Sequence, residues 1–431
     1  MKVGRGHAYR IRKERIITSV VTWGVALASL VGILVRPKRS PEWAWALGGA
    51  AVLVAIGSVS VPAAWHAVAR GTDVYLFLVG MLVLAELARA SGVFDWLATL
   101  AVRAAEGSAT RFFAIVFGVG VVVTAVLSND ATAVVLTPAV AAAARKARTA
   151  PLPHLYACAF VANAGSFVLP ISNPANLVIF GGAMPPLPTW LATFALPSFG
   201  ALLLTFVALR IVWRRDLAAS VATDLAPVAL SLAGKTSLGA IVLAAIALGL
   251  ASSRGLPLGA VTAACAAIAF VVAVGVERKL AGIVRQVSWG VIALVAGLFV
   301  LVAGIDATGV LASARAAVVA LSGAPPWQAI AVAGTTTALV SNVTNNLPSG
   351  LLSGLALAGA PHPIALAAAT AIGIDLGPNL SVTGSLATIL WLIALRRDEI
   401  AVGPWTFLRI GAVVMPPALF AALGLLALLV R

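Results

Sequence analysis

Long apolar runs separated by short polar connections make up most of the chain. The clearest runs lie at 16–35, 43–62, 74–90, 193–213, 258–276 and 404–430. A helix needs about 20 predominantly apolar residues to cross a bilayer, whereas the strands of a membrane β-barrel give only a weak alternating pattern. The pattern therefore predicts an all-α polytopic membrane protein with about ten to twelve transmembrane helices.

One apolar run is interrupted by the polar triplet Ser128-Asn129-Asp130. Asp130 is the only ionisable residue between 112 and 144, and this run is too long for a single straight span. Ser, Asn and Asp are favoured helix N-caps, so we expect one helix to end near Leu127 and another to begin at Ala131, inside the membrane. Such a break is tolerated only where protein or a water-filled cavity satisfies the backbone, as in the broken helices of transporters.

Other apolar runs later in the chain are also interrupted by polar residues. Ser341-Asn342 follows another apolar run, 213 residues after Ser128-Asn129, and further polar breaks lie at 172–176 and 377–385. The segments 79–94 and 296–311 also match when the chain is shifted by 217 positions. Interrupted segments in the same order in both parts of a chain indicate a secondary transporter with internal repeats. We therefore predict two repeated halves, 1–225 and 226–431, with broken helices and re-entrant hairpins at the midplane.

Composition excludes a soluble globular protein. The chain is 61% hydrophobic and 10% charged, whereas the charged share of soluble domains is about a quarter. The net charge of +15 comes from short Lys/Arg clusters between apolar runs, which are typical of topology signals and lipid contacts rather than of nucleic-acid binding. Cys158, Cys265 and the four histidines show no metal-ligand spacing, so neither a metal nor a cofactor is predicted. No nucleotide-binding P-loop occurs, so an ion gradient is the predicted energy source.

The N-terminus carries a topology signal. Six Lys or Arg residues precede the apolar run 16–35, which is too long for the core of a signal peptide. This run is predicted to be a first span with a cytoplasmic N-terminus. The basic cluster 36–39 at its other end opposes that orientation, which leaves the signal mixed.

Four segments resemble the ArsB-type arsenite/antimonite efflux permeases. They are 128–138, 289–302, 341–348 and, the most specific of them, 376–391. The resemblance covers nearly the whole chain from the third span onward. It implies export of trivalent arsenic and antimony across the inner (cytoplasmic) membrane by exchange with protons, which would confer metalloid resistance. It also implies inverted halves, with a scaffold and a transport domain in each protomer. An ATPase of the ArsA type is a partner that the resemblance allows.

The polar residues at the four breaks suit that substrate. Arsenous acid is a small neutral trihydroxy molecule near pH 7, so its site needs amides and hydroxyls that donate and accept hydrogen bonds without a fixed charge. Two separated cysteines cannot form a trithiolate site. Each amide or hydroxyl also has the simpler interpretation of capping a helix end. The expected substrate-binding residues are Ser128, Asn129, Asn173, Asn176, Ser341, Asn342, Thr344, Asn345, Asn346, Asn379, Thr383 and Ser385.

Asp130 and Asp375 are the candidates for proton coupling. A carboxylate inside the hydrocarbon region is costly and usually functional, and Asp130 lies in the first break. Asp375 flanks the fourth break and is the second candidate. By contrast, Glu86 and Arg89 lie three residues apart near the end of a span, where we expect them to pair along the helix or to extend to the interface.

Two other functions stay open at this point. A sodium/proton antiporter, or a sodium-coupled dicarboxylate or anion carrier of the same ion transporter superfamily, would use Asp130, the amides and unwound carbonyls as sodium ligands. A membrane enzyme would need a nucleophile–base pair or a set of metal ligands. None of the four histidines stands near a carboxylate in a polar break. The sequence therefore favours a secondary active transporter over an enzyme.

Overall fold

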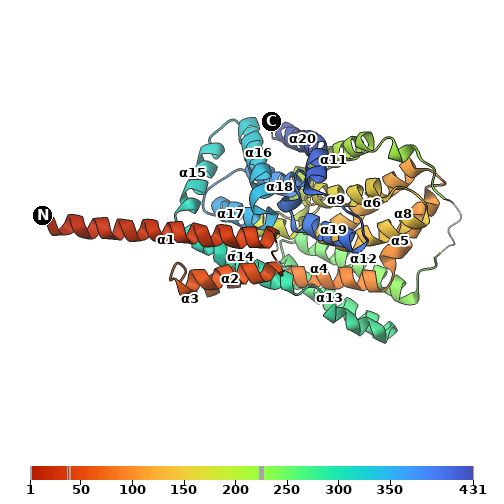
Figure 1. The fold of residues 1–431 in the computed structure, drawn as a ribbon, viewed down its shortest axis with the longest axis horizontal. Coiled ribbons are helices and arrows are strands. Elements are labelled where there is room, and N and C mark those ends of the chain that lie inside the picture. Colours follow the sequence, from red (N-terminus) through yellow and green to blue (C-terminus); the bar gives the residue numbers. More distant parts are fainter. Residues whose placement is uncertain (1, 36, 38–39, 223–227, 431) are drawn as a thin grey trace.

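The protein is built of helices joined by short turns (Figure 1). The computed structural model describes residues 2–35, 37, 40–222 and 228–430, and within 2–16 and 34–35 it describes the backbone alone. No strand occurs in these ranges. The predicted boundary between the halves at 225/226 and the basic residues at 36, 38 and 39 lie outside the described residues.

Up to residue 222, breaks divide the apolar runs into helices of very different length. The elements are α1 (Lys2–Val35), α2 (Glu42–Ala55), α3 (Val61–Arg70), α4 (Thr72–Ala90), α5 (Val93–Ala104), α6 (Ala109–Val126), α7 (Asn129–Ala131), the π-helix η2 (Thr132–Leu136), α8 (Thr137–Lys146), α9 (Pro151–Ala164), the 3₁₀ turn η3 (Pro170–Ser172), α10 (Pro174–Phe180), η4 (Gly181–Ala183), α11 (Leu187–Val212) and η5 (Asp216–Ala218).

The described residues from 228 onward are likewise divided into helices of very different length. The elements are α12 (Leu232–Ser253), α13 (Leu258–Val276), the 3₁₀ helix η6 (Arg278–Arg285), α14 (Gly290–Ala307), α15 (Val310–Ser322), α16 (Pro326–Thr344), α17 (Asn346–Ala358), α18 (Ile364–Leu376), η7 (Gly377–Asn379), η8 (Val382–Gly384), α19 (Leu386–Arg397) and α20 (Pro404–Leu429).

Fewer helices reach the length of a full span than the ten to twelve predicted. Six in the described part of the chain are long and apolar enough to cross a membrane, and the pair α3–α4, bent by 49°, makes a seventh if it is counted as one span. The other apolar runs appear as shorter helices, among them α2, α10 and the α18–η7 segment. The difference arises because the polar breaks divide runs that hydropathy alone counts as continuous.

Helix starts repeat at the interval that the sequence pattern indicated. The helices α11 and α20 both contain 26 residues and begin at Leu187 and Pro404, which are 217 positions apart. The helices α5 and α15 both begin after a glycine in the left-handed region, Gly92 with φ 77° and Gly309 with φ 89°. Glycine adopts this conformation without the steric cost that a Cβ would add.

Close helix packing also repeats. The helix α4 packs along α13, and α14 packs along α2. A Cβ on Gly80 would lie 2.8 Å from the backbone oxygen of Thr262, and one on Gly297 would lie 2.6 Å from the backbone carbonyl carbon of Ala46. Small residues allow membrane helices to approach this closely. The two glycines lie 217 positions apart, and each allows a close contact with the backbone of the neighbouring helix.

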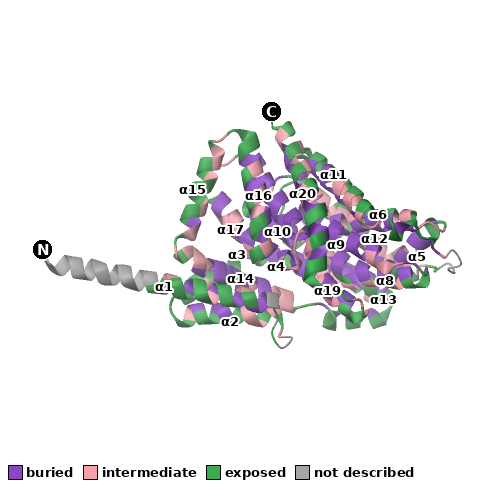
Figure 2. Cartoon of the chain, turned by 45° about the horizontal axis from the view of Figure 1, so that its top comes forward, coloured by how far each residue is buried: buried purple, intermediate pink, exposed green. Residues whose placement is uncertain are grey.

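The core of the molecule is formed by α9 and α18. Every residue of α18 from 365 to 376, and every residue of α9 from 153 to 164, is buried. Figure 2 shows the same burial around α9 and α10, while the helices at the periphery carry exposed apolar side chains. The polar breaks that end α9 and α18 therefore lie inside the protein.

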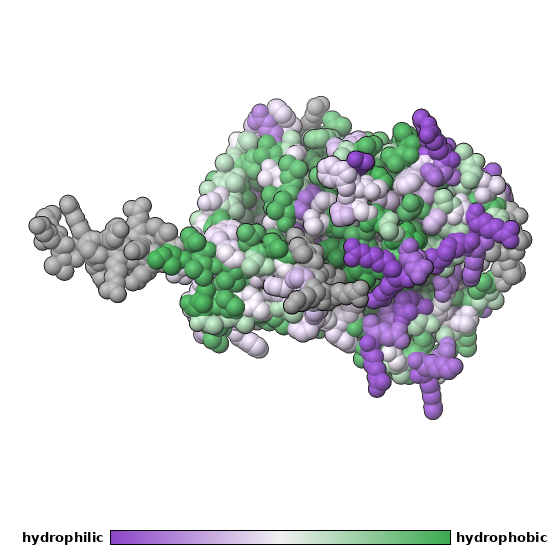
Figure 3. Space-filling model, in the orientation of Figure 1, coloured by the Kyte–Doolittle hydropathy of each residue, from purple (hydrophilic) through white to green (hydrophobic). Residues whose placement is uncertain are grey.

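On the face shown in Figure 3, charged side chains of the described residues gather at one end. The hydrophilic surface lies mainly on the right-hand side of Figure 3, where Figure 1 places α5 and α8. The Arg145 guanidinium at the end of α8 pairs with the Asp398 carboxylate at the end of α19, with an N–O distance of 3.3 Å. The C-terminal ends of α8 and α19 therefore lie next to each other in this charged region.

Candidate functional site

The first predicted break is present at Ser128. Its φ of 156° and ψ of 166° lie in a backbone region that is essentially restricted to glycine. The Ser128 hydroxyl accepts a hydrogen bond from the Ala131 amide at 3.3 Å, and the buried Asn129 side chain accepts one from the Asp130 amide at 2.9 Å. The π-helix η2 follows, and π-helical turns are frequent at functional sites. The helix therefore restarts as expected, with Ser128 as its cap.

The second break lies within the polar stretch predicted at 341–350, but it begins four residues after the first residue of that stretch. The helix α16 continues through Ser341, Asn342 and Thr344, and the chain breaks at Asn345, whose φ is 74° and ψ 153°. Ser341 and Asn342 each donate a side-chain hydrogen bond to the Ala338 carbonyl within their own helix, so neither interrupts it. Asn345 is 217 positions after Ser128 and shares its unusual backbone region. It caps α17 by accepting the Leu347 amide at 3.4 Å.

The third break is organised by Asn173. Its side-chain oxygen caps α10 by accepting the Ala175 amide at 3.0 Å, and its side-chain nitrogen donates to Oδ1 of Asp375 at 2.7 Å. Asn176 instead donates to the Ser166 carbonyl at 2.8 Å, which satisfies the chain just after α9. Asn176 therefore has a structural contact, whereas Asn173 joins two distant parts of the chain.

The fourth break links the central helices. The side-chain nitrogen of Asn163 in α9 donates to Oδ1 of Asn379 at 3.0 Å and to the Thr388 hydroxyl at 3.2 Å. Asn379 in turn donates to the Phe160 carbonyl at 3.0 Å. Ser385 caps α19 by accepting the Ala387 amide at 3.1 Å. Asn163 and Asn379 lie 216 positions apart, so this bond joins nearly equivalent positions of the repeat.

Side chains of the second and fourth breaks meet directly. The Ser381 hydroxyl donates to Oδ1 of Asn342 at 2.6 Å, and the Thr383 hydroxyl donates to the Asn342 carbonyl at 2.8 Å. The Asn345 side chain donates to the Thr383 carbonyl at 3.2 Å. Thr344 and Asn346 flank this network, Thr344 bonding the Ser349 hydroxyl and Asn346 lying buried at the start of α17. The second break is thus held by contacts from residues about 40 positions away.

Asp375 is the most deeply placed carboxylate in the described part of the chain. It is fully buried near the end of α18, and its Oδ1 accepts the hydrogen bond from Asn173. Its Oδ2 is buried without a hydrogen-bond partner among the described residues. A buried polar atom without a partner is uncommon and calls for an explanation such as a proton or a transient ligand. The structure therefore places Asp375 in the interior of the protein.

Asp130 lines one of two cavities that share lining residues. An inner cavity of about 50 Å³ is lined by Ser128, Asp130, Pro174, Glu86 and Gln286, together with Ser288 and mostly apolar side chains. An outer cavity of about 660 Å³ shares Glu86, Gln286 and Ser288 with it and is also lined by Arg89, Asp95, Arg397 and Asp398. The two cavities therefore adjoin at these residues. Among the predicted site residues, Ser128 and Asp130 line this route.

The sequence also predicts that Asn129, Asn173, Asn342 and Asn379 wall one polar cavity, and none of the four lines either cavity described above. Asn129, Asn173 and Asn379 are buried and engaged in the hydrogen bonds described above, while the half-buried Asn342 belongs to the network around Ser381. The amides hold the breaks in shape, and the route to Asp130 passes beside them. The reason is that a side-chain amide at a chain break has freed backbone groups within reach and bonds to them first.

Several residues on the route were not identified as site residues from sequence. Arg89 bonds both Glu86 and Gln286, which confirms the expected pairing along α4 and ties that helix to the chain before α14. The sequence does not reveal that Glu86 and Gln286 line both cavities. Asn163 was also missed, because it lies within an apolar run, although its spacing of 216 from Asn379 was a usable signal.

No group of three or more His, Cys, Asp or Glu side chains in the described residues is arranged to hold a metal ion. Cys158 is buried in α9 and Cys265 is half-buried in α13, on separate helices and away from the breaks. The donors at the candidate site are therefore oxygens and amide nitrogens.

Comparison with known proteins identifies relatives over almost the full length of the chain. The family model described as "Citrate transporter" (CitMHS) matches residues 30–373. An arsenical pump membrane protein of Escherichia coli is 29% identical over 426 residues, covering 94% of this chain and 97% of the relative. An uncharacterized transporter of Mycobacterium tuberculosis (strain H37Rv) is 26% identical, covering 88% and 92%. The crystal structure of the Alcanivorax borkumensis YdaH transporter, described as having an unusual topology, has a similar fold with a TM-score of 0.58, 18% identity and coverage of 85% and 87%. The resemblance inferred from the sequence motifs is confirmed.

Proposed function

This chain belongs to the citrate transporter family, and we propose that within it the chain exports arsenite and the chemically related antimonite in exchange for protons. It is a multi-pass membrane transporter and not an enzyme, as its family and relatives are transporters. The arsenical pump relatives support arsenite as the substrate. They also support a location in a bacterial inner membrane. The family description raises citrate as the competing substrate, so the charge of the site decides between the two.

The observation that carries the proposal is the charge lining the inner cavity. Asp130 lines it together with Glu86, whose carboxylate is paired with Arg89, and no Lys, Arg or His lines it in the described residues. A citrate or dicarboxylate anion entering this space would lose hydration and meet charge of its own sign. Arsenous acid carries no charge near pH 7, and it can exchange hydrogen bonds with the Ser128 and Ser288 hydroxyls and the Gln286 amide. The lining therefore favours a neutral trihydroxide over an organic anion.

We assign proton coupling to Asp130, with Asp375 as the second carboxylate. Asp130 lines the inner cavity, where a proton can exchange with water arriving through the outer cavity. Asp375 is bound to Asn173 of the third break and has one unpartnered oxygen, so a change in its charge would bear on the packing of α10 against α18. Carboxylates in the hydrocarbon region are typical of proton relays in transporters.

The halves 1–225 and 226–431 are proposed to be repeated in inverted orientation. Two helices of the first half have basic C-terminal ends. Arg145 and Lys146 lie in the last turn of α8, and Arg210 lies in the last turn of α11. The residues 217 positions later are His362, Pro363 and Ala427. Cytoplasmic loops are enriched in Lys and Arg, so this difference supports opposite sides of the membrane for equivalent ends. The outer cavity then opens to the cytoplasm, as an inward-facing exporter requires.

Transport in everted membrane vesicles tests the proposed substrate and coupling ion together. With the lumen acidified, the vesicles should accumulate arsenite, and replacing sodium by choline should leave the rate unchanged. Excess citrate or succinate should not compete, because the inner cavity offers them no cation. A strict sodium requirement would refute proton exchange, and competition by citrate or succinate would assign the chain to the carboxylate carriers of its family.

The cysteines are predicted to be dispensable for transport. A Cys158→Ala, Cys265→Ser double variant should retain at least about half of the parent rate, because oxygen and nitrogen atoms line the route and neither thiol does. Alanine is chosen at 158 because a hydroxyl buried in α9 would need a partner. Arsenite resistance is measured in a host without its own exporter. Loss of resistance with normal membrane insertion would show that a thiol takes part.

A further inference from the structure

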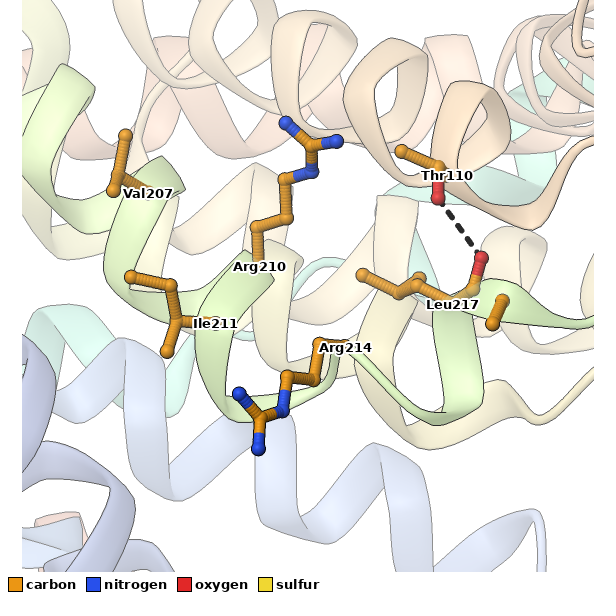
Figure 4. Close-up of a pocket in the computed structure, with 7 residues that line it drawn as sticks. Thr110, Val207, Arg210, Ile211, Arg214 and Leu217 are labelled. Carbon is orange, nitrogen blue, oxygen red and sulfur yellow. Dashed lines mark hydrogen bonds between the residues drawn. The ribbon is translucent and has the colours of Figure 1, made fainter.

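A third cavity, of about 360 Å³, lies away from the transport route. It is formed where the last turns of α11 meet the start of α6 and the turn η5. Its lining residues are Thr110, Val207, Arg210, Ile211, Arg214, Leu217 and Ala218. The Thr110 hydroxyl donates to the Leu217 carbonyl at 2.8 Å and so fixes η5 against α6 (Figure 4). The cavity is therefore a built feature at the junction of three elements.

The charge of this cavity is positive. Arg210 and Arg214 are exposed and line it, no Asp or Glu in the described residues does so, and neither arginine forms a hydrogen bond or an ion pair with a described residue. The neighbouring Glu106 is engaged by Arg111. A guanidinium group that is free of carboxylate partners is well suited to bind phosphate, with two parallel N–H donors.

Apart from Thr110, the rest of the lining is apolar. Val207 and Ile211 lie on the same helix as the two arginines, and Leu217 closes the other side. Figure 4 shows the Arg210 side chain extending toward the side of Thr110, while the Arg214 side chain extends in the opposite direction. A ligand that fits must therefore combine an anionic head, with more than one phosphate to reach both guanidinium groups, and an apolar part.

The position along α11 agrees with such a ligand. The helix is long and apolar enough to cross the membrane, with Arg210 in its last turn and Arg214 just after it. The bond from the Ala222 amide to the Ala147 carbonyl links the segment after η5 to the end of α8, where Arg145 and Lys146 lie. Basic pockets between membrane helices on the cytoplasmic side are typical sites for anionic lipid headgroups. We propose that this cavity binds the phosphate-bearing headgroup of an anionic phospholipid, with a diphosphatidyl lipid such as cardiolipin contacting both arginines. This site is independent of the transported substrate.

Bound lipid would also stabilise the region around it. The segment after η5 bonds along the turn between α5 and α6, where the Val221 amide donates to the Gly107 carbonyl at 2.9 Å, and reaches the end of α8, where the Ala222 amide donates to the Ala147 carbonyl at 2.9 Å. A headgroup held by α11 would therefore stabilise the contact between α6, α8 and the connection that follows η5.

Native mass spectrometry of the purified full-length protein, titrated with cardiolipin, tests the proposal. An Arg210→Gln, Arg214→Gln double variant should bind cardiolipin about tenfold more weakly than the parent, because it loses the charge-assisted phosphate contacts. Arg215→Gln is the matched control, since Arg215 is an exposed neighbour that does not line the cavity. Each single arginine variant is measured as well, so that a folding defect in the double variant leaves the test intact.

Three outcomes would overturn the proposal. Unchanged cardiolipin affinity in the single and double variants would remove the arginines from lipid binding. An equal loss in Arg215→Gln would indicate a diffuse basic surface in place of a site. Displacement of cardiolipin by millimolar inorganic phosphate, or equal binding of phosphatidylcholine, would show that the cavity selects free phosphate or any lipid.

Discussion

An Asp130→Asn variant is expected to insert and fold normally but to lose arsenite export driven by a proton gradient. The amide has nearly the same shape as the carboxylate and can remain at the start of α7, where the Asp130 backbone amide donates to Asn129. It cannot gain or lose a proton. If Asp130 carries the coupled proton, uptake by everted vesicles under an acid-inside gradient should fall at least about 100-fold, as expected when a transport step loses roughly 3 kcal/mol.

Asp95→Asn is the matched control for this variant. Asp95 lines the outer cavity but is exposed, so it adds charge near the entrance without lying at the break. It should change the rate no more than about twofold, within the small range of surface substitutions. If Asp130→Asn instead retains the parent rate and the parent pH profile, coupling does not depend on Asp130 and the assignment moves to Asp375.

The first break was predictable because local chemistry determines it. Ser128 both interrupts an apolar helix and caps the next one. It caps that helix by accepting a hydrogen bond from the amide three positions ahead, so the cap depends only on residues next to it in the sequence. The N-capping preference of serine was therefore enough to place it. Asn173 and Ser385 belong to the same class, since each caps the helix that begins one residue later.

The start of the second break was predicted four residues too early, because contacts with distant residues determine where α16 ends. The pair Ser341-Asn342 repeats the letters of Ser128-Asn129, yet in a helix these side chains can bond the Ala338 carbonyl and leave the helix intact. The break falls at Asn345, whose side chain bonds the Thr383 carbonyl 38 residues away. No single-sequence pattern supplies that partner. The interval of 217 taken from glycines 80 and 297 would have placed the break at Asn345, because backbone geometry follows the repeat more closely than side-chain identity does.

The route to Asp130 shows the same limit. The spacing of Glu86 and Arg89 predicts their pairing, and the pair is present. That Glu86 also lines the inner cavity depends on Gln286, which lies about 200 residues away and bonds Arg89. Hydropathy likewise gives the apolar runs correctly, but whether a run forms a full span or two short helices is decided by hydrogen bonds such as that between Asn163 and Asn379.

Asp375→Asn is expected to reduce transport strongly while leaving its pH dependence recognisable. The amide oxygen can still accept the hydrogen bond from Asn173, so the contact between α10 and α18 should persist. The amide nitrogen, however, places a donor where the unpartnered Oδ2 now lies, and the group can no longer change charge. Because Asp130 would still exchange protons through the cavities, the remaining transport should follow the parent pH profile, which separates the roles of the two carboxylates.

Asn173→Ala tests the same pair from the other side. It leaves the buried Asp375 carboxylate without its donor, and an unsatisfied buried group costs roughly 1–3 kcal/mol, equivalent to about a 5- to 150-fold weakening of the state that needs it. Asn176→Ala is the matched control, because that amide bonds the Ser166 carbonyl and does not touch Asp375. Initial rates of arsenite uptake are compared at equal membrane abundance. If Asp375→Asn transports at the parent rate, or if Asn176→Ala is as damaging as Asn173→Ala, then Asp375 is a structural carboxyl and the Asn173–Asp375 contact has no separate part in transport.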